Sequence, residues 1–445
     1  MMRSMFSGVS GLQTHQTGMD VIGDNISNVN TVGFKGSRAT FADMMSQTLQ
    51  PAQGPNDRGG INPQQVGMGV GLASIDTDIS QGSLESTGNS TDLAVEGDGY
   101  FVVNDGTEDY YTRAGNFSVD ENGNLVSSTN GFQVQGWMAE DGELPSTTAD
   151  QMEEINVYDE QIMMGDATTE AEFSGNLDAN ALRDAAEEEG IDMDDYDFDE
   201  YGPHELVTLD IYDSQGGTAT ITFGFEQTDD NEWTIHYGEG DNWEEDWEEL
   251  DDIEFDSSGN LESVGGDDDE DSFTLEDLSD FLDNGAEYGA IDEDGDFEDE
   301  IEIDLSGLTQ VKDDFSAEAT ATDGVAYGYL DDFEIAGDGA ITGTYTNGES
   351  QTLAQIALAD FENPAGLEQV GDNIMTTSQN SGEASISTPG ATGMGDLSAG
   401  TLEMSNVDLS QEFTKMIQTQ RGFQANSASI TTSDEMLQEL VNLKR

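Results

Sequence analysis

Both ends of the chain carry apolar residues at helical spacing, and the first such pattern covers residues 2–26. Positions separated alternately by three and four residues are apolar at six of eight places, which is typical of a helix face that packs against another helix. Asn and Gly residues between positions 28 and 33 are expected to end the helix because both tolerate left-handed backbone. The positions predicted to lie in an assembly interface are Met5, Val9, Leu12, Met19 and Ile26.

The second pattern follows residue 405, where Ser and Asp three residues apart have the spacing of a capping box at a helix start. An apolar residue then recurs every seven positions, and the companion row is apolar only at its two ends. A helix of about 40 residues would be about 58 Å long, and a lone helix cannot bury so narrow a stripe. We therefore expect the two terminal helices to pair as a coiled-coil-like core domain that also contacts further partners. The predicted contact positions are Leu409, Phe413, Met416, Phe423, Ile430, Leu437 and Val441.

Between the helical patterns, apolar and polar residues alternate with period two, which predicts antiparallel strands. Residues 92–103 are expected to form two strands around a GDG turn, and residues 116–126 a hairpin around Asn122-Gly123. Further strands are expected at 207–212, 218–225, 234–237, 324–335, 341–345 and 353–359. The predicted fold class is mainly β with long terminal α-helices and two nested, mostly antiparallel β domains.

Changes in composition along the chain suggest where these domains begin and end. Gly, Pro, Ser, Asn and Gln are frequent at residues 51–70 and 378–400, and acidic runs occupy residues 184–200, 239–254 and 265–302. The predicted organisation is an N-terminal helix of the core domain (1–50), a connector (51–70), an inner β domain (71–165 and 326–395), an outer acidic β domain (166–325) and a C-terminal helix of the core domain (396–445).

The charge of the chain is extreme in sign and uneven in position. The 445 residues include 96 Asp and Glu but only 11 Lys and Arg, for a formal net charge of −85. Self-repulsion of this size is screened at about 1 M salt, so we interpret the composition as that of a protein from a halophile. Residues 1–58 and 415–445 together hold eight bases and seven acids, whereas the rest holds three bases and 89 acids. Near-neutral ends are expected if both are buried in protein in the working state, where unpaired carboxylates are costly.

Several classes of protein and site are disfavoured by the same composition. An anionic surface makes nucleic acid and anionic membranes unlikely partners. The absence of Cys excludes disulfides and thiolate metal sites, and no apolar run approaches the roughly 20 residues of a membrane span, so no membrane insertion is expected. The N-terminal residues lack the continuous apolar core of a cleaved signal peptide, so any export would need another route.

No pattern of residues predicts catalysis, a cofactor or a metal site. His15, His204 and His236 belong to no metal or nucleophile motif, and the GxGxG of residues 67–71 lacks a surrounding βαβ unit. The acidic run at 292–300 fails as a calcium loop because Gly295 would fall at loop position 4 rather than 6. We therefore predict no enzymatic activity, no cofactor and no dedicated metal site.

Seven short motifs resemble the signatures of the bacterial flagellar rod and hook family. They are MFSGVSGL (5–12), DVIGDNISN (20–28) and NTVGFK (30–35) near the start, GDGYFVV (97–103) and YTRAGNF (111–117) in the β region, and LEMSNVDL with TQRGFQAN (402–409 and 419–426) near the end. Within them, the residues expected to matter are Asn25, Asn28, Thr31, Gly33, Phe34, Lys35, Asn406, Val407, Asp408, Arg421 and Gly422. In the centre, two motifs resemble the hook protein branch of the family: YDSQG (212–216) and QIALA (355–359, within a similar stretch at 339–373). The large central region favours the same branch, because rod subunits of the family are expected to lack one.

The resemblance implies a structural subunit of the flagellar hook, an extracellular curved and hollow tube attached to the basal body. Such a tube is a flexible joint that transmits torque from the rod to the filament. The resemblance also implies export in unfolded form through the type III apparatus without a cleaved signal peptide. The implied partners are further copies in a homo-polymer, rod subunits, a hook cap protein, a hook-length control protein and hook–filament junction proteins.

Three hypotheses and two alternatives follow from these patterns. The terminal helices would order only on assembly, the polar row Gln420, Ser427 and Asp434 would face a water-filled channel, and carboxylate-rich outer domains would slide over one another when the tube bends. A distal rod subunit of the same family is one alternative. A secreted acidic, cation-binding adhesin is the other, although it leaves the matched helical ends unexplained.

Overall fold

The computed structural model describes residues 2–443, except for 53, 55–59, 61, 141, 146, 190–200, 213–215, 230, 239–246, 266–270, 276–289, 292–296 and 299–300. The chain divides into two compact units. The terminal unit contains Met1–Asp159, Asp332–Gly343 and Ser350–Arg445, and the central unit contains Glu160–Asp331 and Thr344–Glu349. The calcium-like run at 292–300 lies almost entirely outside the described residues.

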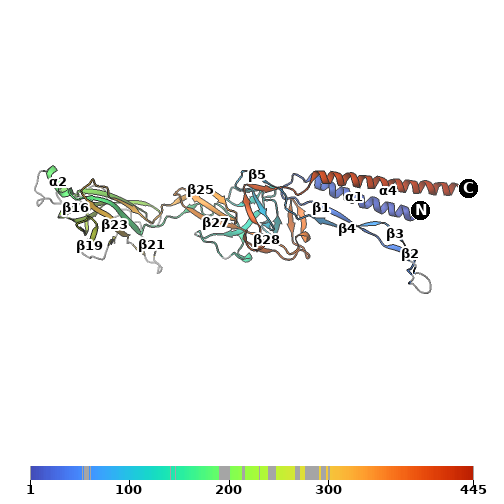
Figure 1. Ribbon diagram of the computed structural model, residues 1–445, viewed down its shortest axis with the longest axis horizontal. Helices are drawn as coiled ribbons and strands as arrows, with labels where there is room; N and C mark the ends of the chain where they lie inside the picture. The colour runs from blue at the N-terminus through green and yellow to red at the C-terminus, as the bar shows by residue number, and fades with distance from the viewer. Residues whose placement is uncertain are drawn as a thin grey trace. The chain divides into compact units, whose positions relative to one another are not determined.

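Two antiparallel helices form one part of the terminal unit (Figure 1). They are α1 (Met2–Ser27) and α4 (Leu409–Leu443). The Asp408 carboxylate accepts hydrogen bonds from the Ser410 and Gln411 backbone N–H groups at 2.7 and 3.2 Å, so this residue caps the start of α4. The capping box predicted over residues 405–408 is therefore wrong in its cap, because Asp408 rather than Ser405 caps the helix, although α4 begins directly after that motif. Helix α1 ends next to the predicted Asn and Gly residues.

Two successive pairs of antiparallel strands, which we call the hairpins, follow α1 and were not predicted; the first pair contacts α1. Strand β1 (Ser37–Asp43) pairs with β4 (Val70–Thr77), and β2 (Ser46–Gln50) pairs with β3 (Gln64–Gly67). Residues 51–70 therefore do more than connect, because they contain β3 and the start of β4. Most side chains of β2 and β3 are exposed, so the strands lack the alternation of buried and exposed positions that a sequence pattern can detect.

The β body of the terminal unit surrounds a core that includes Leu93, Phe101, Phe117, Leu125 and Trp137, all fully buried. Phe101 and Phe117 meet edge to face with ring centroids 5.0 Å apart. The strands are β5 (Leu84–Ser86), β6 (Leu93–Glu96), β7 (Tyr100–Asn104), β8 (Asp109–Thr112), β9 (Phe117–Val119), β10 (Leu125–Ser127), β11 (Gln133–Met138), β12 (Glu153–Glu154), β26 (Ala340–Tyr345), β27 (Ser350–Ile356), β28 (Leu358–Asp360), β29 (Glu368–Gly371), β30 (Ile374–Thr376), β31 (Ser385–Ser387), β32 (Asp396–Ala399) and β33 (Thr401–Glu403). Short 3₁₀ turns occur at Ala149–Gln151 and Pro364–Gly366.

The pairing of these strands confirms one predicted hairpin and corrects the other. Strands β9 and β10 pair around Asn122-Gly123, where the Asp120 carboxylate accepts two backbone N–H groups. Strands β6 and β7, in contrast, do not form a hairpin, because β6 pairs with β32 and β7 pairs with β8, β11 and β28. Gly97 and Gly99 have φ of +117° and +133°, and this backbone directs the chain from one sheet into another.

In the central unit, a four-stranded sheet and a five-stranded sheet share one hydrophobic core. Phe173 from the first sheet meets Phe223 and Phe225 from the second, with centroids 5.1 and 5.8 Å apart. The first sheet contains β14 (Glu170–Asp178), β20 (Ser272–Leu275), β23 (Ile301–Val311) and β24 (Glu318–Ala321). The second contains β15 (Glu205–Tyr212), β16 (Thr218–Asp229), β17 (Glu232–Gly238), β18 (Glu248–Phe255) and β19 (Leu261–Val264). The unit also has α2 (Ala181–Glu189), β13 (Ile162–Met163), β21 (Ala290–Ile291), β22 (Phe297–Glu298) and the first half of β25 (Gly328–Ile335).

One histidine makes the stability of the central unit depend on pH. The Gln227 backbone N–H donates to Nδ1 of His204 at 2.9 Å, and burial lowers the pKa of His204 from 6.5 to about 4, although Glu226 opposes the shift. Below pH 6.5 the unfolded chain binds a proton that the folded chain does not, so stability is lost as the pH falls from 6.5 to 4.

Between pH 7 and pH 5 we expect the wild type to lose about 2 kcal/mol more stability than His204→Asn, which keeps an acceptor but does not titrate. Urea unfolding of both proteins at the two pH values measures the difference. The many carboxylates titrate in both proteins, so equal losses would contradict the assignment.

Candidate assembly surface and junction of the chain ends

The contact between α1 and α4 is built from small residues on α1. The buried residues of this helix are Gly8, Gly11, Thr14, Gly18, Ile22 and Asn25, spaced three or four positions apart. A Cβ atom added to Gly8 would lie 2.9 Å from the Ile430 side chain, and one added to Gly11 would lie 2.6 Å from Asn426 Nδ2. Gly422 of α4 is packed in the same way against the His15 ring, at 2.5 Å. The glycines allow the two backbones to approach closely.

The buried line of α1 is therefore not the apolar line that the sequence suggested. Met5, Leu12, Met19 and Ile26 are half-buried, and Val9 is exposed. On α4, half-buried positions are Met416, Phe423, Ile430 and Leu437, whereas Leu409, Phe413 and Val441 are exposed. The polar row Gln420, Ser427 and Asp434 is exposed as well. The assignment of these apolar residues to an interface between copies remains a prediction.

Exposed apolar side chains are concentrated near the two ends of the sequence, in residues 1–84 and 409–445, which together hold eight bases and ten acids and are therefore also nearly neutral. Seventeen of the 26 large hydrophobic side chains that are exposed among the described residues lie before residue 85 or after residue 408. They are Phe6, Val9, Phe41, Met44, Met45, Leu49, Val66, Met68, Leu72, Ile75, Ile79, Leu84, Leu409, Phe413, Ile417, Met436 and Val441. A surface with so much exposed apolar area marks a site of protein association.

A buried ion cluster joins four distant segments of the terminal unit. Lys35 Nζ lies 2.6 Å from Glu403 Oε1, with side chains 2% and 0% exposed, and Arg113 Nη1 lies 3.6 Å from Glu403 Oε2. Lys35 also donates to the Ser80 carbonyl at 3.0 Å, and the Gly82 N–H donates to Glu403 Oε1 at 2.8 Å. We call Lys35, Arg113 and Glu403 the ion cluster. Its contacts connect four segments: the residues after α1, the loop after β4, the β body and strand β33. We call this region the junction.

Burial changes the pKa of one member of the ion cluster, Lys35. Desolvation lowers the pKa of Lys35, and the hydrogen bond and charge of Glu403 offset part of that effect. The Arg113 guanidinium lies 5.0 Å from the Tyr100 ring centroid and donates to the Gly97 carbonyl at 2.8 Å. Two cations thus share one buried carboxylate, so removal of that carboxylate would leave both without a counter-charge.

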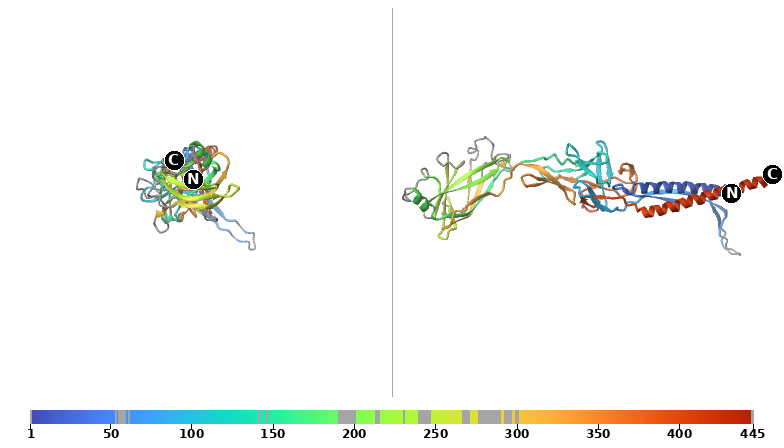
Figure 2. Two further views of the ribbon diagram at one scale, coloured as in Figure 1. Left: turned by 90° about the vertical axis from the view of Figure 1, so that its left-hand side faces the viewer. Right: turned by 90° about the horizontal axis from the view of Figure 1, so that it is seen from above.

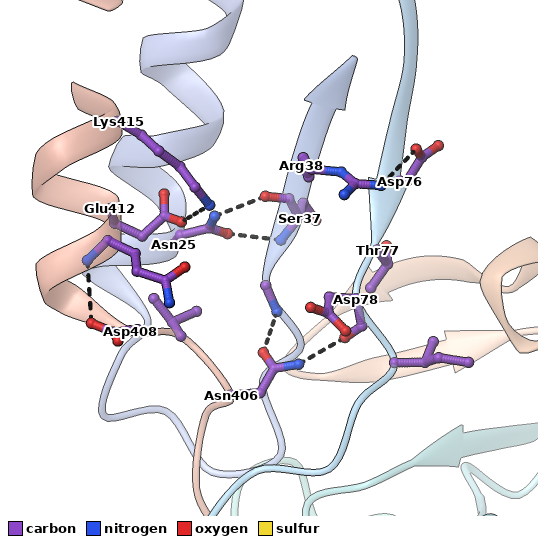
Figure 3. A pocket seen from close by; sticks show the side chains of 14 residues that line it. Asn25, Ser37, Arg38, Asp76, Thr77, Asp78, Asn406, Asp408, Glu412 and Lys415 are labelled. Carbon is purple, nitrogen blue, oxygen red and sulfur yellow. Dashed lines mark hydrogen bonds and ion pairs between the residues drawn. The ribbon is translucent and has the colours of Figure 1, made fainter. Parts of the chain in front are cut away.

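Two asparagines brace the same junction from the side of the helices (Figure 3). Asn25 of α1 exchanges two hydrogen bonds with the Ser37 backbone, at 2.8 and 2.9 Å. Asn406 accepts from the Gly36 N–H at 2.8 Å and donates to the carbonyls of Asp78 and Ser80 at 2.9 and 3.0 Å. These bonds fix the first residues of β1 and the loop after β4 relative to both helices.

The other motif residues have more local roles. Thr31 donates to the Asn28 side chain at 3.2 Å, Phe34 is buried, and Val407 lies next to Gly36. Arg421 is exposed and bonds to Gln424 on the same helix. Glu403 and Arg113 were not singled out from the sequence although both stand in the quoted motifs. The available signal was a charged residue between the apolar residues Leu402 and Met404. This signal is weak here because acidic residues are common throughout the chain.

Gly33 offers a direct test of the junction. Its φ is +68°, and an added Cβ atom would lie 2.6 Å from the Ala114 backbone N. We expect Gly33→Ala to cost about 3 kcal/mol, from left-handed strain together with the backbone clash. Gly88→Ala is the matched control, because its φ is +74° but nothing lies within 4 Å of the added atom, so strain alone costs about 1 kcal/mol. Thermal unfolding of the two variants compares these costs, and equal costs would contradict the clash.

Two further properties of the described residues concern metal ions and membranes. They contain no cluster of three or more His, Asp or Glu residues able to hold a metal ion. Among the helices that the structure describes, none is both long and apolar enough to cross a bilayer.

Four family models match consecutive parts of the chain. The model described as flagella basal body rod protein matches residues 5–35, and the flagellar hook protein FlgE/F/G D1 domain matches 94–172. The flagellar basal body protein FlaE D2 domain matches residues 176–325, and the flagellar basal body rod FlgEFG protein C-terminal model matches 398–443.

Curated relatives align over the whole chain. The flagellar hook proteins FlgE of Borreliella burgdorferi and Treponema pallidum are each 40% identical, and each alignment covers 100% of both sequences. The flagellar basal-body rod protein FlgG of Bacillus subtilis is 30% identical, also over 100% of both sequences. A crystal structure of Helicobacter pylori flagellar hook protein FlgE2 is 15% identical and covers 72% of this chain and 100% of that chain, with a TM-score of 0.42, which is too low to support any conclusion.

Proposed function

The chain belongs to the flagellar hook protein family and is a structural protein rather than an enzyme, and from this premise we propose how its residues build the hook. Copies associate through the exposed apolar residues of α1, α4 and the two hairpins, and the polymer is a curved, hollow tube. The observation that carries the proposal is the concentration of exposed apolar side chains in the near-neutral ends of an otherwise acidic chain. These residues would be buried by neighbouring copies, and the ion cluster would hold the helices in position for that contact.

A distal rod subunit is the second candidate within the same family. The rod protein of Bacillus subtilis aligns over its full length, so a large central region does not by itself separate hook from rod. The higher identity to two hook proteins, 40% against 30%, favours the hook. A deletion strain would separate the two, since loss of a hook subunit leaves rods without hooks.

The finer features of the hook are further parts of this proposal. The helix pair would form the inner wall of the tube, with Gln420, Ser427 and Asp434 toward the channel. The β body and the central unit would lie at larger radius. Because family models named for rod proteins match both ends of the chain, the terminal surfaces that bind other copies would also bind rod subunits. The hook cap, length-control and junction proteins and the type III apparatus complete the proposed set of partners, with export in unfolded form.

We also propose that assembly needs concentrated salt, because the central residues carry nearly all of the net charge. Purified protein should form short curved tubes at about 1 M salt or above and remain dispersed in dilute buffer, as seen by negative-stain electron microscopy. Unassembled particles under all salt conditions would contradict the structural role and would favour an acidic adhesin. Tubes of equal number and curvature at every salt concentration would contradict the role of charge alone.

A further inference from the structure

A groove lies where α1 ends and α4 begins, which we call the foot of the helix pair. It has a volume of about 680 Å³ and is lined by the end of α1, the start of β1, the end of β4 and the first turns of α4 (Figure 3). A second hollow of about 170 Å³ shares Ser37, Arg38, Glu412 and Lys415 with it. We call the two together the foot groove.

The foot groove has an acidic part and an apolar part. Asp76, Asp78, Asp408 and Glu412 line the larger hollow with only two bases, Arg38 and Lys415. The smaller hollow adds the apolar residues Val21, Ile22, Ala39 and Phe41 to the residues that it shares with the larger one. A segment that carries apolar side chains followed by basic ones would match this division.

Glu412 is the second observation that indicates an occupant. Its side chain is 7% exposed and lines both hollows. Lys415 Nζ donates to Oε1 at 2.6 Å, but Oε2 has no hydrogen-bond partner among the described residues. A buried carboxylate oxygen without a partner is costly, and a donor from an incoming segment would remove that cost.

The opposite end of the helix pair presents a segment of the required kind. Ser4 of α1 meets Ser433 of α4 at 3.3 Å, and α4 continues past this point with no α1 residue beside its last turns (Figure 2). Ten residues after Ser433 span about 15 Å. Val441 in this overhang is 66% exposed, Asn442 is exposed, and Lys444 and Arg445 follow in the sequence.

We propose that the overhang of α4 from a second copy occupies the foot groove. The inference rests on the proposed polymer and names one contact within it. Val441 meets the apolar part, and the positive charge that follows it in the sequence matches the acidic part, where Glu412 Oε2 lacks a donor. The contact joins two different surfaces of the same chain, and such a head-to-tail contact propagates into a filament when the rotation between successive copies does not close a ring.

The absence of cysteine allows a direct test by cross-linking within assembled tubes. Arg38→Cys places a thiol in the foot groove at a side chain that is 71% exposed, and Asn442→Cys places one on the overhang. A short bis-maleimide should convert tubes of the double variant into a ladder of multimers on a denaturing gel. The matched control replaces the overhang site by Lys312→Cys, an exposed position in the central unit, and should give no ladder.

Co-assembly keeps the test decisive if the double variant assembles poorly. The two single variants, mixed with excess wild type, should give cross-linked dimers, whereas neither alone should do so. Intact tubes without these dimers would overturn the inference and leave the proposed function standing, whereas failure of wild type to form tubes would count against the function itself. Cross-linking of Arg38→Cys to a hairpin variant, Met45→Cys, in place of Asn442→Cys would show that a hairpin occupies the groove.

A charge exchange tests the acidic half of the contact. Lys444→Glu with Arg445→Glu should raise the concentration needed for assembly by about tenfold, and Asp76→Lys added to them should restore most of it. Lys312→Glu with Arg183→Glu makes the same change in net charge at two exposed positions of the central unit and should have little effect. Equal effects of the two pairs would overturn the proposed role of the basic residues.

Discussion

Glu403→Ala is expected to destabilise the terminal unit by about 3–5 kcal/mol, because it leaves Lys35 and Arg113 buried without a counter-charge. The unfolding temperature of that unit should fall by on the order of 10 °C. The central unit has its own core and should unfold as in the wild type. Differential scanning calorimetry of the full chain would measure the two transitions.

Double-variant analysis separates the ion pair from simple loss of packing. Glu403→Gln keeps the shape and an acceptor for the Gly82 N–H, whereas Lys35→Met removes the nearer cation. If the cost comes from an uncompensated cation, Lys35→Met combined with Glu403→Gln should be less destabilised than the sum of the single variants. Strict additivity would show that the two side chains contribute independently.

The stability of the terminal unit should also depend on pH, through the titration of Lys35. The pKa of Lys35 is lowered by burial, so the unfolded chain holds its proton more tightly and stability should rise as the pH increases toward 10.5. In Glu403→Gln the influence that raises the pKa is gone, so the rise should begin at a lower pH. An unchanged pH profile would mean that Lys35 does not respond to Glu403.

The helices could be predicted from the sequence because their signals are local. Asp408 caps α4, and the heptad positions after it describe a real face of that helix. The face by which α1 meets α4 could not be predicted in the same way, because half of its six buried residues are glycine. Gly8 and Gly11 add nothing to a hydrophobic pattern, and their value lies in the close approach of Ile430 and Asn426, which only the folded chain reveals.

Pairing between distant strands was the other feature that the sequence did not reveal. Residues 92–103 contain two strands as predicted, but β6 pairs with β32, which lies about 300 residues later in the chain. Glu403 follows that strand closely, and its importance depends on Lys35 and Arg113, which arrive from two other segments. Motif resemblance marked the right region of the chain, whereas the partners within it required three-dimensional structure.

Replacing both Phe413 and Ile417 of α4 by Ser is expected to prevent assembly at concentrations that suffice for the wild type, while the isolated chain stays folded. The two side chains are 50% and 59% exposed, so they contribute little to the fold of one copy. Ser, Phe and Ile also have similar helix propensities, so α4 should persist. Burial of the exposed halves against a neighbour contributes roughly 2 kcal/mol in total, which corresponds to about a thirtyfold rise in critical concentration.

Sedimentation of the polymer over a series of protein concentrations measures this rise, and thermal unfolding of the unassembled variant verifies its fold. Leu206→Ser with Val311→Ser is the matched control, since both side chains are exposed but lie in the central unit. That control should assemble at nearly the wild-type concentration if the contacts that drive polymerisation lie in the terminal unit. Equal loss of assembly in the two double variants would mean that apolar burial is spread over the whole chain. An unchanged critical concentration for the α4 variant would remove Phe413 and Ile417 from the interface and leave α1 and the hairpins as the remaining surfaces to test.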